Sequence, residues 1–273
     1  MSLFDVDPQS CIRDGICAAV CPMGIIDFEK GAYPTPNAAA DELCIRCGHC
    51  VAVCPTGSLS HRDMPVDQCP SVRKELELNP EHCEHFLRSR RSIRTYKDQP
   101  VSRAEITKLI EMARYAPSGH NTQCAEWLVV DNRDEVRKLT GIVAEWMRWM
   151  LANEPEIAQS LHMDITLKRY EKGTDVILRD APVVLVAHAP AKHRLGTSSC
   201  LIALSYLDLA APSLGLGTCW AGYFNASATI FPPMQQALAL PDGHQAFGSM
   251  MLGYPKFSYQ RLPTRKAPAI VWR

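Results

Sequence analysis

Residues 11–54 read CIRDGICAAVCPMGIIDFEKGAYPTPNAAADELCIRCGHCVAVC and hold seven of the twelve cysteines of the 273-residue chain. The second half of this stretch has the spacing C-x2-C-x2-C-x3-C-P, formed by Cys44, Cys47, Cys50, Cys54 and Pro55. The first half has the same spacing, formed by Cys11, Cys17, Cys21 and Pro22, but Asp14 occupies the position of the second cysteine.

This spacing is typical of bacterial cubane iron–sulfur sites, in which the fourth cysteine of each run binds the other cluster. Three thiolates two residues apart can surround one face of a cubane, because a tight loop turns their Cβ atoms inward. The pattern predicts two clusters, and the stretch resembles two-cluster bacterial ferredoxins over residues 3–62. One cluster takes Cys21, Cys44, Cys47 and Cys50, and the other takes Cys11, Cys17, Cys54 and position 14. A zinc ribbon or disulfides fit less well, because zinc sites prefer paired C-x2-C units.

Asp14 departs from the ferredoxin pattern and leaves two outcomes open. A carboxylate is a harder ligand than a thiolate and binds iron more weakly. Asp14 either completes a [4Fe–4S] cluster or lies beside a [3Fe–4S] cluster from which the fourth iron is lost, whereas the other cluster is [4Fe–4S]. Either outcome changes the reduction potential of this cluster.

The composition favours a globular protein of one large domain or of two smaller ones. The chain is 47% hydrophobic and 21% charged, and its formal net charge is zero. No basic stripe favours nucleic acid, and no polybasic tail favours a membrane surface. The first residues lack the features of a signal peptide, so we expect a reducing, cytoplasmic location for the cysteines. The weakly charged stretch 201–222 is expected to be a buried helix that runs into a strand, and not a membrane span.

The chain after the cysteine stretch predicts a linker and a second domain. We expect a ferredoxin domain at residues 1–62, a surface linker at 63–88 and an α+β domain at 89–273. Ser102 and Glu105 form a predicted capping box for a helix through residue 115. Further helices are expected at 134–150 and 197–214, where Pro212 should kink or end the second one. Strands are expected at 127–131, 182–188, 248–254 and 269–272.

Four segments of the second domain suit an anionic cofactor. Guanidinium groups match phosphate oxygens, and the domain opens with Arg90, Arg91, Ser92 and Arg94. A turn at 116–123 offers hydroxyl and amide donors. Glycines at 215–222 allow a ligand to approach the backbone closely, and further lysines and arginines follow at 256–266. Taken in this order, the segments resemble the nitroreductase family over about residues 88–273. The whole chain resembles the members of that family that carry an N-terminal ferredoxin domain.

The resemblance implies an α+β sandwich, a homodimer and FMN at the subunit interface. It implies that the FMN phosphate and ring edge are bound by Arg90, Arg91, Ser92 and Arg94. It assigns a turn that reaches FMN from the partner subunit to Pro117, Ser118, Gly119 and Asn121. It places Ala221 and Gly222 beside the flavin N5, and it places Arg265 and Lys266 on the phosphate. No residue of this chain is assigned a catalytic acid–base role.

Two segments depart from the family or leave alternatives open. Cys124 stands where the family usually has proline, and it is either a reactive thiol near the flavin or a small buried hydrophobe. The segment containing Trp146, Trp149 and Met163 is either a lid over the flavin or core packing, and we favour the core.

The resemblance implies an FMN-dependent oxidoreductase that receives electrons through its own iron–sulfur clusters and reduces a small acceptor. Nitroaromatics, quinones and activated alkenes are candidate acceptors. The external donor is NAD(P)H or a reduced carrier, and NAD(P)H would dock transiently because the sequence shows no dinucleotide fingerprint. The alternative is an electron-transfer protein that docks to a partner enzyme, and a flavin sensor is less favoured because no output domain is evident.

Overall fold

A computed structural model describes residues 2–273, which form two compact units. Unit 1 comprises the chain up to Glu77 together with Gly119–Thr122, and unit 2 comprises Leu78–Ser118 and Gln123–Arg273. Each unit has its own apolar core, so each is described separately. None of the helices in residues 2–273 has the length and apolar character that crossing a membrane requires.

Unit 1 consists of two small antiparallel sheets and three short helices. Strand β1 (Phe4–Val6) pairs with β4 (Leu59–His61), and β2 (Ile26–Asp27) pairs with β3 (Thr35–Pro36). The helices are α1 (Ile16–Ala19), α2 (Ala40–Leu43) and α3 (His49–Val53), and 3-10 turns follow at Val66–Gln68 and Lys74–Leu76. Because the apolar core is small, most of the cysteine side chains lie at its margin, partly buried.

The two halves of unit 1 repeat the same backbone bend. Arg13 and Arg46 have positive φ angles of 58° and 52°. Two residues later, Gly15 and Gly48 have φ angles of 72° and 73° and begin α1 and α3. Glycine suits this left-handed conformation because it has no Cβ atom. At Gly15 an added Cβ would also lie 2.4 Å from Phe28. The bend therefore presents Asp14 in the first half where it presents a cysteine in the second.

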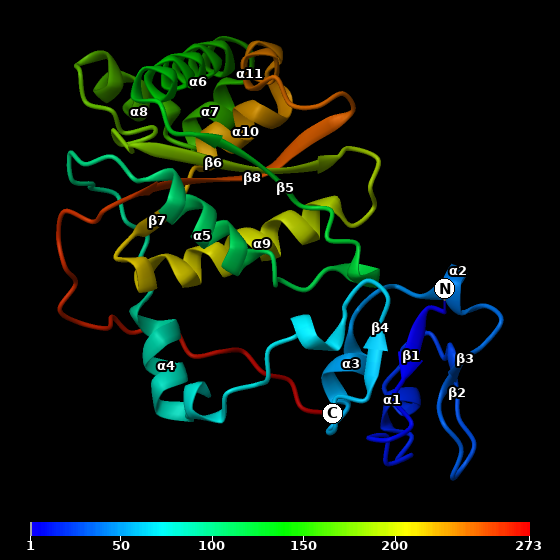
Figure 1. The fold of residues 1–273 in the computed structure, drawn as a ribbon. Helices are drawn as coiled ribbons and strands as arrows, with labels where there is room; N and C mark the ends of the chain where they lie inside the picture. The colour runs from blue at the N-terminus through cyan, green and yellow to red at the C-terminus, as the bar shows by residue number, and fades with distance from the viewer. Residues whose placement is uncertain (1) are drawn as a thin grey trace. The chain divides into compact units, whose positions relative to one another are not determined.

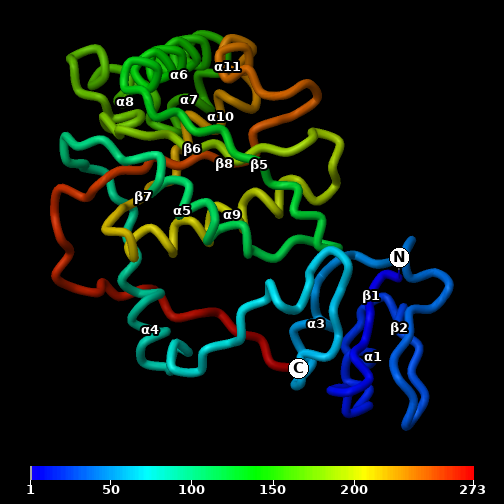
Figure 2. Tube along the Cα trace, viewed as in Figure 1, coloured from blue at the N-terminus to red at the C-terminus, as the bar shows by residue number. Residues whose placement is uncertain are grey.

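Unit 2 is a three-layer sandwich around a four-stranded antiparallel sheet (Figure 1). The strand order is β5 (Glu126–Val130), β6 (Val183–Pro190), β8 (His244–Gly253) and β7 (Gly217–Trp220). Helices α5 (Arg103–Ala113) and α9 (Gly196–Ala210) cover one face, and they run side by side in the trace (Figure 2). The other face carries α6 (Arg133–Asn153), α7 (Pro155–Ser160), α8 (Met163–Glu171), α10 (Gly222–Ile230) and α11 (Pro232–Leu238). The α+β sandwich is confirmed.

A β-bulge interrupts the pairing of β6 with β8. Ala187 pairs with Gly248, but His188 pairs with Ala246, so Phe247 is the extra residue on β8. Residues directly opposite each other lie on the same face of a sheet, and successive residues alternate between faces. The bulge therefore turns Ala246 and His244 toward the face of β6 that carries His188.

Most of the expected elements of unit 2 are present. The helices expected at 134–150 and from 197, and the strands expected at 127–131, 182–188 and 248–254, correspond to α6, α9, β5, β6 and β8. The stretch 201–222 is a helix followed by a strand, β7, as predicted, but only one face of the helix is buried in the described chain. Pro212 lies in a 3-10 turn, Ala211–Leu214, directly after α9, because proline cannot donate the hydrogen bond that would continue the α-helix.

Four further expectations have mixed outcomes. The strand expected at 269–272 is wrong: the segment is irregular and exposed, with Trp272 87% exposed, because it has no sheet neighbour. Trp146 and Met163 are buried in the core, although Trp146 also lines a cavity described below and Trp149 is 47% exposed. Cys124 packs against the α5–α9 side of the core as a small hydrophobe. The segment expected to be a linker contains a helix, α4 (Pro80–Ser89), capped by Asn79.

The capping box at the start of α5 is confirmed and supports a stability prediction. The Ser102 hydroxyl accepts from the backbone N–H of Glu105, whose carboxylate accepts from the Ser102 N–H and from the Tyr254 hydroxyl. Ser102→Ala should lower the free energy of unfolding by about 1 kcal/mol, which for a unit of this size lowers Tm by about 2–4 °C in calorimetry.

The same capping box predicts a pH dependence with a defined sign. Hydrogen bonds from Ser102, and then from Tyr254, hold the pKa of Glu105 below its ordinary value of 4.5. The stabilisation is therefore present above pH 4.5 and is lost as the pH falls through the lowered pKa. The Tm difference between wild type and Glu105→Gln should narrow on acidification. Glu111→Gln, on the exposed face of the same helix, is the control and should show no such trend.

Candidate functional site

The first hollow of unit 1 joins both halves of the cysteine repeat. It is lined by Cys11, Asp14, Cys17 and Cys54. One oxygen of Asp14 accepts from the backbone N–H of Ile16 at 3.2 Å. Burial opposes ionisation of the Cys54 thiol, but hydrogen bonds with Ser58 and Thr56 outweigh it and lower the pKa of Cys54 to about 7. Three sulfurs and one carboxylate therefore converge on this hollow.

The second hollow of unit 1 is lined by the complementary set of four cysteines, Cys21, Cys44, Cys47 and Cys50. Burial raises the pKa of the Cys50 thiol to about 11, with Cys47 and Cys44 adding to the shift. A buried thiolate therefore needs a nearby positive charge, which bound iron would supply. Four of the potential ligands that line the hollow are cysteine sulfurs, the ligand type that selects iron–sulfur clusters and zinc.

His61 lies against the second hollow in a defined tautomer. It is 2% exposed, and its Nδ1 accepts from the backbone N–H of Asp63 at 3.0 Å. Burial lowers the pKa of His61, so its ring is neutral and carries its proton on Nε2. That nitrogen is 3.5 Å from the sulfur of Cys44 and donates to it. A second donor to the same sulfur is the backbone N–H of Arg46, at 3.4 Å.

The cysteine sulfurs of unit 1 are spaced too widely to share a single ion. All twelve cysteines are free, which removes the disulfide alternative. Zinc bonds of about 2.3 Å to sulfur hold the ligands of one ion within about 4 Å of each other. In residues 2–273, no set of three cysteine sulfurs meets a 4.8 Å limit, and the only group that does contains no cysteine.

Arginines line a wide cavity of unit 2, whose volume of about 1160 Å³ includes space open to solvent. Arg90 and Arg91 enter it beside the start of β7, and Lys97 and Lys256 add positive charge. The Arg90 guanidinium lies 3.4 Å from Asp208 on α9, which is 6% exposed and also accepts a hydrogen bond from a β7 hydroxyl. The buried carboxylate therefore holds one guanidinium at the cavity wall.

Close backbone packing fixes this wall. The backbone N–H of Ile93 donates to the carbonyl of Thr218 at 2.8 Å, and a Cβ added to Gly217 would lie 2.3 Å from the Ile93 side chain. Thr218 also donates its hydroxyl to Asp208. The arginine segment and β7 can approach this closely only because residue 217 has no side chain.

A second cavity of unit 2 lies across β7 from the first. It is lined by Arg94, Arg179, Trp220, Gly222, Met251 and neighbouring apolar residues. Gly222 leaves open space where a side chain would lie, and the buried Ala221 donates its N–H to the carbonyl of Ser249 at 2.9 Å. A planar, partly apolar ring with a polar edge would suit these walls.

The predicted cofactor residues do not all gather in these two cavities. Arg90 and Arg91 line the first, and Arg94 and Gly222 line the second, whereas the Ser118 hydroxyl lines neither and accepts from the N–H of Gln123. Pro117 and Ser118 belong to unit 2, but Gly119 and Asn121 belong to unit 1. There Asn121 donates to the carbonyls of Arg46 and Ile45 at 2.8 and 3.2 Å. Ser92 lies beside Cys219, and the exposed Arg265 and Lys266 line neither cavity.

Three residues of these sites escaped the sequence analysis. Asp208 was visible as the single charge in an apolar helix, and that isolation was the available signal. Arg179 follows no motif, and its φ of 58° is a tertiary feature. His61 lies fourteen residues beyond Cys47, at no recognisable spacing from the cysteines.

Comparison with known proteins assigns both units. A model of the nitroreductase family matches residues 87–254, which is more than half of the chain. The chain belongs to the nitroreductase family. A model of the 4Fe-4S dicluster domain matches residues 10–59, so this nitroreductase carries an N-terminal iron–sulfur domain. Both resemblances inferred from the sequence are confirmed.

Individual relatives agree with the family assignment. The nitrobenzene nitroreductase of Ectopseudomonas oleovorans is 27% identical over 197 residues, which cover 63% of this chain and 86% of the relative. The FMN reductase [NAD(P)H] of Bacillus subtilis is 26% identical over 171 residues, which cover 62% and 64%. The crystal structure of a nitroreductase with bound FMN from Bacteroides fragilis has a TM-score of 0.59 at 21% identity. That similarity covers 71% of this chain and 98% of the other, and it shows the common fold.

Proposed function

We propose that this nitroreductase is an FMN-dependent oxidoreductase that receives electrons through its own iron–sulfur clusters and reduces a small acceptor. A nitroaromatic, a quinone or an activated alkene is the acceptor class. The observation that carries the proposal is that one chain combines two four-ligand hollows in unit 1 with an arginine-lined cavity in unit 2. Relatives named for nitrobenzene reduction and for FMN reduction with NAD(P)H support both the cofactor and the reaction type.

The donor sets of unit 1 fit iron–sulfur clusters. Cys21, Cys44, Cys47 and Cys50 would hold a [4Fe–4S] cluster, since four thiolates are its usual ligands. Cys11, Cys17 and Cys54 would hold the other, which is [4Fe–4S] if Asp14 binds iron and [3Fe–4S] if it does not. The matching backbone bends at Asp14 and Cys47 support ligation by Asp14.

The cavities of unit 2 fit FMN in their charge and shape. When bound, FMN supplies the one- and two-electron chemistry, and the clusters supply one-electron chemistry. Arg90 and Arg91 would bind the phosphate, with Asp208 fixing Arg90 in place. Arg94 and Gly222 would lie along the ring, where the open space at Gly222 admits an aromatic edge. Ser92, Pro117, Ser118, Gly119, Asn121, Ala221, Arg265 and Lys266 remain proposed FMN contacts.

A homodimer is part of the proposal. The outward face of α9 exposes Leu201, Ile202 and Tyr206 at 38%, 37% and 42%. These side chains form an apolar surface that a second copy of the chain would cover. In such a dimer the turn at 116–123 would reach the partner's FMN, as the family resemblance implies.

An anaerobic reduction experiment tests the proposal. The purified protein should show a flavin band and a broad iron–sulfur shoulder, and both should bleach with dithionite. The reduced protein should then turn over repeatedly with nitrobenzene, a quinone or an activated alkene. An absent flavin band would contradict the proposal. A single round of oxidation with every acceptor would instead support the electron-transfer alternative, in which the protein docks to a partner enzyme.

His61 provides a test of the second cluster by its potential. His61→Phe removes the hydrogen bond from Nε2 to the Cys44 sulfur while keeping an aromatic ring in the core. Donors to sulfur stabilise the reduced, more negative cluster. A bond worth about 0.5–1.5 kcal/mol corresponds to a potential lower by about 20–60 mV for one electron. EPR-monitored titration should show this shift for one cluster only, and an equal shift of both clusters would contradict the assignment.

A further inference from the structure

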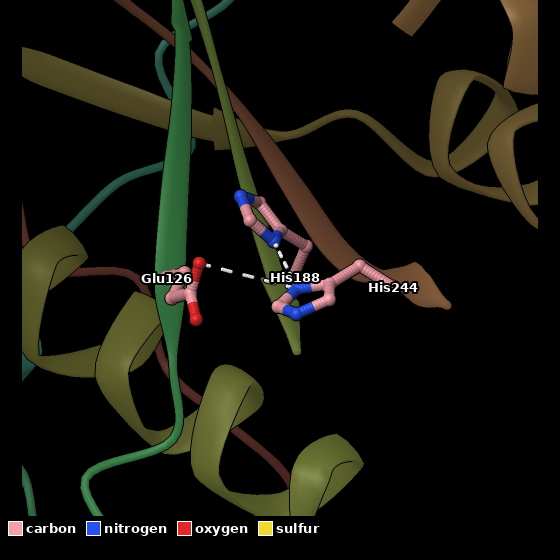
Figure 3. Close-up of side chains that lie close together, drawn as sticks. All are labelled: Glu126, His188 and His244. Atoms are coloured by element: carbon pink, nitrogen blue, oxygen red, sulfur yellow. Dashed lines mark hydrogen bonds and ion pairs between the residues drawn. The ribbon is translucent and has the colours of Figure 1, made fainter. Parts of the chain in front are cut away.

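Two histidines and one glutamate gather at one end of the unit 2 sheet (Figure 3). Glu126 begins β5, His188 lies near the end of β6, and His244 begins β8. Glu126 is directly opposite His188 in the β5–β6 pairing. His244 is opposite Pro190, two residues along the same face from His188. All three side chains therefore project from the same face of three neighbouring strands.

The β-bulge is what completes this group. With continuous pairing from Ala187, Pro190 would face Gln245, and His244 would project from the opposite face. The extra residue on β8, Phe247, shifts the alternation by one. β-bulges commonly re-aim a side chain in this way, and they are frequent beside functional sites.

The distances between the three groups suit one small cation. The Nδ1 atoms of His188 and His244 are 3.0 Å apart, and His244 Nδ1 is 4.0 Å from a Glu126 oxygen. One ligand atom from each residue lies within 4.8 Å of the other two, and no other such group occurs in the described part of the chain. A tetrahedral ion with bonds of 2.0–2.1 Å separates its ligands by about 3.3 Å. Small rotations of the three side chains would reach that separation.

The chemistry of the group selects the class of ion. Two imidazoles with one carboxylate suit Zn²⁺ and Fe²⁺, whereas Mg²⁺ and Ca²⁺ prefer sites built from oxygen. Burial is the main cause that lowers the pKa of His188, which favours the neutral ring that binds metals. His188 is buried, with 4% of its surface exposed, whereas 55% of the Glu126 side chain is exposed. An ion could therefore enter the site from solvent on the Glu126 side.

We propose that Glu126, His188 and His244 form a site for a divalent transition-metal ion, with a fourth position open to water or a small ligand. The site shares no residue with the cysteine hollows or with the arginine-lined cavities. Without a metal, the same residues make a hydrogen bond between the two rings, with the carboxylate near His244. This metal-free, hydrogen-bonded arrangement is the alternative explanation that the experiment must exclude.

Zinc is the probe for this test. Holoprotein with intact clusters, verified by its iron content, is treated with a chelator, given one equivalent of Zn²⁺ and desalted. We expect about one zinc per chain in excess of a chelated control. X-ray absorption at the zinc edge should show nitrogen and oxygen at about 2.0–2.1 Å with imidazole scattering, and no sulfur shell at about 2.3 Å. Competition by Fe²⁺ under anaerobic conditions distinguishes the two candidate ions.

Variants separate this site from adventitious binding. Glu126→Gln and His244→Asn change partly exposed side chains and should each weaken zinc binding by more than about 10-fold. Mutation of a residue that only supports a metal ligand already lowers metal affinity by about that factor, so loss of a ligand should lower it more. His85→Ala, on the exposed face of α4, is the matched control and should bind zinc as the wild type does. Unchanged binding in both ligand variants, or a sulfur shell around zinc, would overturn the proposal.

Discussion

Replacement of both Cys47 and Cys50 by alanine should remove about half of the iron and sulfide from the purified protein. Both residues line the second hollow, where Cys21 and Cys44 alone cannot hold a cubane. Most of the FMN should be retained, because the arginine-lined cavity belongs to unit 2. A small loss would come through Asn121, which donates to the backbone carbonyls of Ile45 and Arg46 beside Cys47. Turnover driven by a reduced one-electron carrier should be lost, whereas direct reduction of the flavin by dithionite should persist.

The exposed Cys69 gives a matched control for this experiment. It lies in unit 1 and is followed by proline like Cys21 and Cys54, but it lines neither hollow. Cys69→Ala should retain all iron and the EPR signals of both clusters. Full iron content in the double variant would refute the ligand assignment. A complete loss of FMN in parallel with iron would show that unit 2 had also been disturbed, which calorimetry would detect independently.

Replacement of Arg90 by glutamine should weaken FMN binding by roughly 10- to 150-fold. The estimate follows from a charge-assisted hydrogen bond worth about 1.5–3 kcal/mol, with tenfold in Kd for each 1.4 kcal/mol. Asp208 holds the guanidinium at the cavity wall in the wild type. Titration of the FMN-free protein, followed by quenching of flavin fluorescence, measures the change directly. Adding Arg91→Gln should weaken binding further and reduce its dependence on salt.

Arg88 is the control for the loss of positive charge alone. It lies two residues earlier on α4, is 51% exposed and pairs with Glu84 on the same helix. Arg88→Gln should change the FMN Kd less than twofold, because exposed charges are strongly screened. That result is expected if direct contact of Arg90 with the FMN phosphate matters more than the net charge of the segment. Equal weakening by the Arg88 and Arg90 variants would refute a specific phosphate contact.

Local sequence signals predicted those parts of the fold that depend on neighbouring residues. The Ser102–Glu105 capping box and the break at Pro212 follow from backbone hydrogen bonding over a few residues, and both are present. The cysteine spacing indicated which side chains would converge, since each run surrounds its hollow through local turns. The terminal apolar run 269–272 was misjudged, because a strand needs a partner that local sequence does not specify.

The remaining site features depend on contacts between distant segments. Arg90 and Asp208, which form an ion pair, are 118 positions apart in the sequence. Gly217, at the start of β7, packs against the side chain of Ile93. The approach of His61 to Cys44 depends on the pairing of β1 with β4. Glu126, His188 and His244 meet only through strand order and one bulge. A single sequence shows none of these juxtapositions, because it does not fix register.

The repeated bend in unit 1 has a consequence for how the two clusters can differ. The same glycine-supported turn presents position 14 and position 47, so the ligand difference between the halves at this position resides in one side chain and not in the local backbone. A single codon change at either position can therefore retune one redox centre while its twin and the polypeptide frame are left intact.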